Sequence, residues 1–308
     1  MSYFHPRYWL VWLGLGLLRL IALLPWRLQM ALGQLLGKTF YILLKKRREI
    51  CCINLELVFP HLSPVERERL NRQHFISLAQ GFLEASFSWW GSDQALTPLL
   101  QTEGEEHLTS ALNENKKILL LSAHFTSLEL GGRLLTLLYP DIQLHVVYRP
   151  HQNKLIENQV AKVRTKRYGK AIANSQIREM IKSLKDGFPL WYAQDQNYRG
   201  KSSIVVPFFG IPTATHSATS RFAKLSGATV IPFFTVRIKE GYLLRFLPPL
   251  EDFPGDDVEQ DTVRINELIE SQIEEFPEQY LWTHKRFKTT GKDFYQQYSQ
   301  NHPESNCQ

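Results

Sequence analysis

The feature that most constrains the fold is a regular alternation of short apolar runs and amphipathic segments from residue 117 onward. The apolar runs are typical of strands in a covered sheet and lie at 117–122, 142–147, 189–193, 203–206, 228–236 and 241–247. Segments of helical periodicity lie at 126–138, 152–168, 176–186, 215–226 and 258–276. This alternation predicts an α/β fold with a central, mostly parallel sheet flanked by helices. The 308 residues suffice for one sizeable core.

The N-terminus is dominated by one apolar run, YWLVWLGLGLLRLIALLPW, at residues 8–26, in which Arg19 is the only charged residue. A helix that crosses a bilayer needs roughly 20 such residues. We therefore predict that residues 1–27 form a membrane anchor, as a transmembrane helix or one lying in the interface, with a buried amphipathic helix as the alternative. Because basic residues cluster after the run, the positive-inside rule predicts that the rest of the chain is cytoplasmic.

The remaining chain divides into a domain at 28–291 and a polar tail at 292–308. Residues 28–50 are predicted to form a basic, amphipathic helix on the membrane surface. A further helix is predicted to begin after Ser63, the N-cap, with Pro64 in its first turn and Glu66 completing a capping box. It should end near Gly91.

The net charge of the chain is +6, and one segment in its second half is basic without any compensating acid. No acidic residue occurs from residue 158 to 177, and five basic residues do: Lys162, Arg164, Lys166, Arg167 and Lys170. Such a segment suits phosphates, sugar-acid carboxylates or an acidic protein. The alternative interpretation is an ordinary solvated helix face.

Two chemically active residues interrupt the apolar pattern of KKILLLSAHFTSLELGG, residues 116–132. His124 follows a predicted strand, at the sheet edge where α/β folds bind ligands, and Glu129 follows five positions later. On one straight helix, positions five apart point about 140° away from each other. A strand-to-helix turn between them would allow contact, so we expect Glu129 to hold His124.

A carboxylate that holds one imidazole nitrogen makes the other a general base of defined tautomer. The segment contains no recognisable protein nucleophile, since Ser122 lacks the GxSxG elbow. The nucleophile is therefore expected to be a substrate group such as a hydroxyl. The alternative is a buried structural histidine beside an ordinary surface acid.

The HxxxxE motif behind an apolar N-terminus resembles the HX4D/E acyltransferases, and the chain is similar to the late (secondary), lauroyltransferase-like acyltransferases of lipid A biosynthesis. The resemblance runs from about residue 47 to 289. Its blocks, in order, are INLELVFPHLS (53–63), AHFTSLE (123–129), VYRPHQN (147–153), AQDQNYRG (193–200), VPFFGIPTAT (206–215) and PEQYLWTHKRFKT (277–289).

This resemblance implies a glycerolipid-acyltransferase-like fold and an acyltransferase active in lipopolysaccharide biosynthesis. It implies transfer of a fatty acyl chain from acyl carrier protein to a hydroxyacyl group of a Kdo-bearing lipid A precursor at the cytoplasmic face of the inner membrane. It implies that His124 is the base and that Glu129 orients it. No metal, redox cofactor or nucleic acid is implied.

Other site residues are expected from the same blocks. One of Arg149, Arg164 and Arg167 should bind the oxyanion or a phosphate, with Arg167 the first choice because it matches the family's basic motif. Asp195 and Gln196 should line the site at another strand end, although an Asx turn is the alternative. Phe208, Phe209 and Gly210 are expected to line the acyl groove, with plain core packing as the alternative.

Three functional alternatives stay open: acyl transfer to another glycolipid, use of acyl-CoA as the donor, and a non-catalytic lipid-binding protein on the membrane surface. The length and saturation of the acyl chain depend on a few residues at the pocket floor, because one methylene group changes binding by only about 1–3 kcal/mol.

Overall fold

The computed structural model describes residues 5–198, 200, 202–290 and 294–301. The α-helices are α1 (Trp9–Ile21), α2 (Trp26–Leu43), α3 (Lys45–Val58), α4 (Pro64–Trp90), α5 (Asp93–Leu96), α6 (Glu105–Asn113), α7 (Leu128–Leu138), α8 (Lys154–Arg167), α9 (Ile177–Lys185), α10 (Ala218–Ser226), α11 (Val258–Glu275) and α12 (Phe294–Asn301). The strands are β1 (Leu100–Glu103), β2 (Ile118–Ser122), β3 (His145–Tyr148), β4 (Lys170–Ala173), β5 (Leu190–Ala193), β6 (Ser203–Phe208), β7 (Ile211–His216), β8 (Thr229–Ile238) and β9 (Gly241–Phe246).

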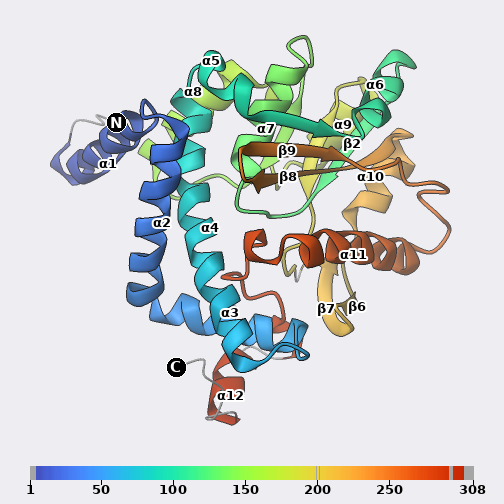
Figure 1. Cartoon of the computed structure of the whole chain (residues 1–308). Coiled ribbons are helices and arrows are strands. Elements are labelled where there is room, and N and C mark those ends of the chain that lie inside the picture. The colour runs from blue at the N-terminus through green and yellow to red at the C-terminus, as the bar shows by residue number, and fades with distance from the viewer. Residues whose placement is uncertain (1–4, 199, 201, 291–293, 302–308) are drawn as a thin grey trace.

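The centre of the molecule is a seven-stranded sheet of order β1-β9-β8-β2-β5-β3-β4 (Figure 1). Every neighbouring pair is parallel except β8 and β9, which form an antiparallel hairpin. The predicted α/β class with a mostly parallel sheet is therefore confirmed. Strands β1 and β4 are additional to the predicted ones.

Strand β2 shows why the strands of the sheet appear in the sequence as continuous apolar runs. All five of its residues are buried, and they point alternately to two cores. Leu119 and Leu121 pack in a core formed with α3, α4, α9, α10 and α11. Ile118 and Leu120 pack in a second core formed with α6 and α7. Helices thus cover both faces, which removes the polar positions that a half-exposed strand would show.

Strands β6 and β7 form a separate antiparallel hairpin. Its turn residues, Phe209 and Gly210, have φ values of 51° and 72°, as a tight two-residue hairpin turn requires. The helix predicted from residue 215 begins only at Ala218, because residues up to His216 belong to β7.

The N-terminal apolar run does not form one long helix. Helix α1 ends at Ile21, a turn follows, and Pro25 is the N-cap of α2. Among the described residues, no helix combines the length and apolarity that a membrane crossing demands. The prediction of a transmembrane helix is therefore not supported, and the single helix expected at 28–50 is divided at Leu44 into α2 and α3.

Helix α2 packs along α4, as Figure 1 shows. The two helices lie close together because two glycines of α2 face α4. A Cβ atom at Gly37 would lie 2.4 Å from the Cα atom of Ile76, and one at Gly33 would lie 2.6 Å from Gln80 Cγ. The predicted start of α4 is confirmed: Ser63 and Glu66 form the capping box.

The expected tail, 292–308, includes helix α12. Tyr295 of this helix is buried, and its hydroxyl donates to Asn54 Oδ1 of α3 at 2.6 Å. Residues 291–293 and 302–308 lie outside the described part of the chain, so the predicted domain boundary at 291 does too.

A buried ion pair joins α4 to strand β8 of the sheet. The Arg237 guanidinium donates to the Glu84 carboxylate through Nε (2.5 Å) and Nη2 (2.8 Å), and the Tyr242 hydroxyl donates to Glu84 at 2.8 Å. The side chains of Glu84 and Arg237 are 1% and 10% exposed. Removing one partner of such a pair leaves the other charge buried without compensation.

Replacing Glu84 by leucine is therefore expected to lower the free energy of unfolding by about 3–5 kcal/mol, measured by denaturant titration. Glu103→Gln is the control, because the Glu103 side chain pairs with Arg245 but is 54% exposed. This substitution should lower the free energy of unfolding by at most about 1 kcal/mol. Equal losses in the two variants would contradict the structural importance of the buried pair.

Candidate active site

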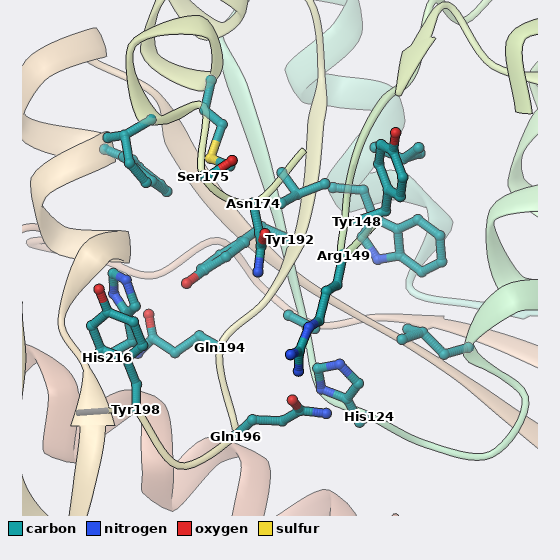
Figure 2. A pocket seen from close by; sticks show the side chains of 18 of the residues that line it. His124, Tyr148, Arg149, Asn174, Ser175, Tyr192, Gln194, Gln196, Tyr198 and His216 are labelled. Atoms are coloured by element: carbon teal, nitrogen blue, oxygen red, sulfur yellow. The ribbon is translucent and has the colours of Figure 1, made fainter. Parts of the chain in front are cut away.

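The candidate site is a cavity of about 550 Å³ at the carboxyl ends of β2, β3 and β5. This is the sheet edge at which parallel α/β folds place their ligands. Helices α7, α8, α9 and α10, the end of β7 and the segments that follow β4 and β5 contribute the rest of its wall. Figure 2 shows His124 and Arg149 on one side and Tyr192, Gln194, Tyr198 and His216 on the other.

His124 is held by Asp195. The imidazole Nδ1 lies 2.6 Å from Asp195 Oδ1, and the backbone N–H of His124 donates to Oδ2 at 3.0 Å. The Asp195 side chain is 1% exposed, whereas that of His124 is 28% exposed. An ionised carboxylate can only accept hydrogen bonds, so Nδ1 carries the proton that faces Oδ1, and Nε2 is left as the basic atom.

The pKa values of the pair move in opposite directions. Burial lowers the pKa of the His124 imidazole, but the charge and hydrogen bond of Asp195 outweigh burial, so the pKa lies above its ordinary value. Burial raises the pKa of Asp195, whereas His124 and, more weakly, Arg286 lower it to about 2. The pair is therefore a buried carboxylate that stabilises a protonated imidazole, as a general base requires.

The loop after β5 that carries Asp195 is positioned by hydrogen bonds on both sides. Thr219 donates to Gln194 Oε1 through its backbone N–H at 3.3 Å. The backbone N–H of Asn197 donates to His284 Nε2 at 3.2 Å. Burial lowers the pKa of His284 to about 4, so this histidine is neutral and can accept. These contacts set the direction of the Asp195 carboxylate.

Glu129 does not hold His124, and the expected contact between them is wrong. The Glu129 carboxylate instead accepts from Arg164 Nη2 at 2.7 Å and from Trp89 Nε1 at 3.0 Å. Helix α7 begins at Leu128, so Glu129 lies in its first turn and faces α4 and α8. Both His124 and Glu129 line the cavity, but they act through different partners.

The three candidate arginines lie in different surroundings. Arg149 lines the cavity, is exposed, and points toward the His124 imidazole in Figure 2. Arg164 also lines the cavity but is paired with Glu129. Arg167, the first choice from the sequence, is not among the cavity residues, and its Nη1 lies 3.6 Å from Asp93 Oδ1. Arg149 is therefore the best placed of the three.

The residues expected to form an acyl groove lie elsewhere. Phe208 is fully buried, with the Arg286 guanidinium 4.7 Å from its ring centre. Phe209 and Gly210 form the turn of the β6–β7 hairpin, where the Phe209 N–H donates to Glu270 Oε1 at 2.8 Å. The alternative interpretation, core packing, is the correct one for Phe208. Of the pair expected after β5, Gln196 lines the cavity, and Asp195 binds His124.

Most of the apolar wall of the cavity comes from segments that carried no motif, and only Leu128 and Val147 lie in blocks of the family resemblance, at 123–129 and 147–153. Its members are Leu128, Val146, Val147, Ile177, Met180, Trp191 and Phe222. The sequence did not single out these residues because their pattern is that of ordinary strand and helix interiors.

His216 was also missed. Its ring lies 4.2 Å from that of Tyr198, centre to centre, and its Nδ1 accepts from the Ala218 N–H at 3.0 Å. Burial lowers its pKa to about 4, so it presents an uncharged ring to the cavity. No sequence signal marks it, because the segment from residue 215 was predicted to be a helix and its place at the end of β7 is known only from the structure. Within the described residues, no group of three or more His, Cys, Asp or Glu side chains could hold a metal ion.

The chain is similar in sequence to bacterial enzymes of lipid A biosynthesis. The family model described as bacterial lipid A biosynthesis acyltransferase matches residues 1–289. The lipid A biosynthesis lauroyltransferase of Escherichia coli is 38% identical over 288 residues, covering 92% of this chain and 93% of the relative. The lipid A biosynthesis palmitoleoyltransferase of the same bacterium is 37% identical over 291 residues, covering 94% of each.

More distant proteins match as well. The lipid A biosynthesis myristoyltransferase of Escherichia coli is 28% identical over 291 residues, covering 94% of this chain and 90% of the relative. The crystal structure of a 1-acyl-sn-glycerophosphate acyltransferase from Thermotoga maritima aligns with a TM-score of 0.39 and 13% identity, over 78% of this chain and 98% of that one.

Proposed function

We propose that this chain, which belongs to the bacterial lipid A biosynthesis acyltransferases, transfers a fatty acyl chain from acyl carrier protein to a hydroxyacyl group of a Kdo-bearing lipid A precursor. The main support for this reaction is the His124–Asp195 pair, which lies at the wall of a cavity that is partly apolar and partly cationic. An intact base and its carboxylate argue against a protein that only binds lipid.

The reaction starts with the acceptor hydroxyl near His124 Nε2. Nε2 removes the hydroxyl proton as the oxygen attacks the thioester carbonyl, and Asp195 stabilises the imidazolium that forms. The tetrahedral intermediate collapses, the carbon–sulfur bond breaks, and the imidazolium returns its proton to the leaving thiolate. An ester and a free thiol result, and the imidazole is neutral again.

The developing oxyanion needs a donor fixed near the reacting carbon. Arg149 is the candidate, because its guanidinium points toward His124 and pairs with no carboxylate in the described part of the chain. Glu129 is proposed to neutralise and hold Arg164, whose guanidinium also lies 4.9 Å from the ring centre of Tyr148. This arrangement leaves Arg164 as part of the wall and Arg149 free to bind the substrate.

The acyl chain is proposed to lie against Val147, Ile177, Met180 and Phe222, the apolar part of the cavity. Met180 and Phe222 are each 1% exposed, so a chain that reaches them is shielded from water. No metal or redox cofactor is part of the proposed reaction.

Membrane attachment is proposed through the exposed apolar surface of α1 and α2. Leu10, Leu13, Leu17 and Leu20 of α1 are 58–82% exposed, and Leu35, Ile42 and Leu43 of α2 are 64–69% exposed. Exposed apolar helix faces beside basic residues are typical of helices that lie in the interface of anionic membranes. We propose that this face binds the cytoplasmic side of the bacterial inner membrane.

The test is mass spectrometry of lipid A from cells with and without this protein. We expect lipid A from cells that contain it to carry one more acyl chain, whose mass also identifies the chain transferred. An identical acylation pattern in the two strains would contradict the proposed acceptor. Purified protein assayed with acyl carrier protein or coenzyme A as the thioester carrier then distinguishes the two possible donors.

A further inference from the structure

The outer faces of α9 and α10 carry a cluster of basic side chains. Arg178, Lys182 and Lys185 follow one another at spacings of four and three, so they form one stripe along α9. Arg221 and Lys224 lie on α10, which packs against α9. All five side chains are exposed. We call these five residues the α9–α10 basic face.

The positive charge of this face is not neutralised by ion pairs within the described part of the chain. Among the described residues, none of the five side chains forms an ion pair. The acid within the α9 stripe, Glu179, is bound to Lys170. Asp186, at the C-cap of α9, is the other acid next to the stripe, and α10 contains none. A basic patch of this kind attracts a negatively charged surface.

The same two helices form part of the cavity. The inner faces of the two helices line the cavity through Ile177 and Met180 of α9 and Phe222 of α10. The basic residues lie on the outer faces of the same helices. A helix with its side chains is about 10–12 Å across. A partner bound to the basic face would therefore lie about one helix diameter from the cavity, close enough to insert a group held on a flexible arm.

A lipid surface is the less suitable partner for this face. The exposed apolar residues of α1 and α2 lie on one side of the molecule, and α10 lies on the other, with the sheet between them (Figure 1). A bilayer that binds α1 and α2 therefore cannot also cover α10. The basic face points to a partner in solution.

We propose that the α9–α10 basic face docks an acidic protein that delivers the acyl thioester to the cavity. This inference rests on the proposed function, because it assigns a location to the carrier of the donor chain. Because the basic face and the acidic partner attract each other through opposite charges, binding should weaken as the salt concentration rises and screens the two surfaces.

The test uses two charge reversals in the full-length protein, Arg178→Glu/Lys182→Glu and Arg221→Glu/Lys224→Glu. Lys116→Glu/Lys239→Glu is the control, because it changes the charge equally at exposed positions outside the face. Binding of holo-acyl carrier protein is measured by calorimetry, and circular dichroism checks that each variant is folded. We expect each reversal on the basic face to weaken binding by about tenfold or more, and the control to match the parent.

Kinetics add a second readout. With the carrier-bound donor, KM should rise in the two reversal variants while kcat changes little. With a small acyl-pantetheine donor, which lacks an acidic protein, KM should equal that of the parent.

Several results would overturn the inference. Carrier binding of equal strength in the parent and the reversal variants would overturn it. So would reversal variants that lose binding to phosphatidylglycerol vesicles but keep binding to the carrier, because that result would assign the face to lipid. If the parent binds the carrier through this face but transfers no acyl chain from either donor, the proposed function fails and the docking site stands.

Discussion

Replacing Asp195 by asparagine is expected to lower kcat/KM for acyl transfer by about 10²–10⁴-fold. The carboxylate receives two N–H groups from His124, the backbone amide and Nδ1. Asparagine offers one acceptor oxygen and one NH2 group, so it cannot receive both. If the amide oxygen keeps the backbone N–H, the NH2 group faces Nδ1, which must then accept, and the ring proton moves to Nε2. The basic atom in the cavity is lost.

The same substitution should change the pH dependence. Asp195 holds the pKa of His124 above its ordinary value, and the base acts only when unprotonated. In the parent, kcat/KM should therefore fall as the pH drops below this raised pKa. Without the carboxylate charge the imidazolium is less stable, its pKa falls, and the acid limb of the profile moves to lower pH.

The matched comparison is Glu129→Gln, because Glu129 is the carboxylate that the HxxxxE spacing would assign to His124. It binds Arg164 and Trp89, so its loss should reduce activity through Arg164 and leave the acid limb near that of the parent. If Glu129→Gln moved the acid limb and Asp195→Asn did not, the pairing in the structure would not be the catalytic one.

The second prediction concerns the base itself. His124→Ala is expected to lower kcat by about 10²–10⁴-fold, since it removes the atom that takes the hydroxyl proton. The double variant His124→Ala/Asp195→Asn should lose no more than His124→Ala, because Asp195 acts only through the imidazole. The measurement is the rate of ester formation from a carrier-bound acyl thioester and a lipid A precursor.

His61→Ala serves as the control, because His61 is exposed in the loop before α4. It should retain parental kcat. Losses that multiply in the double variant would show that Asp195 has a role independent of His124, and parental activity in His124→Ala would refute general-base catalysis by this residue.

Strong local patterns account for what was predictable in the fold. The apolar run at 117–122 predicted a covered strand, which is β2, and the Ser63–Glu66 capping box marked the start of α4 to the residue. Strands β1 and β4 were missed because they are the two edge strands of the sheet and carry few buried side chains, none in β1 and one in β4. Strand β7 was missed because its threonines, at positions 213 and 215, also suit a helix start.

The site was only partly predictable for a related reason. The sequence placed His124 at the carboxyl edge of the sheet because a strand ends there, and Asp195 at a second strand end. It could not show that β5 lies directly beside β2, which is what brings these two ends together. The short spacing to Glu129 was misleading, because the turn into α7 directs that carboxylate toward α8.

The sequence by itself thus predicted most of the elements, the mostly parallel class of the sheet and a candidate for the base, since each depends on neighbours along the chain. The tertiary structure decided which acid holds the base, which arginine faces it and which apolar side chains form the cavity. These depend on strand order and helix packing, and hydrogen bonds between residues 71 positions apart, such as His124 and Asp195, have no local signature.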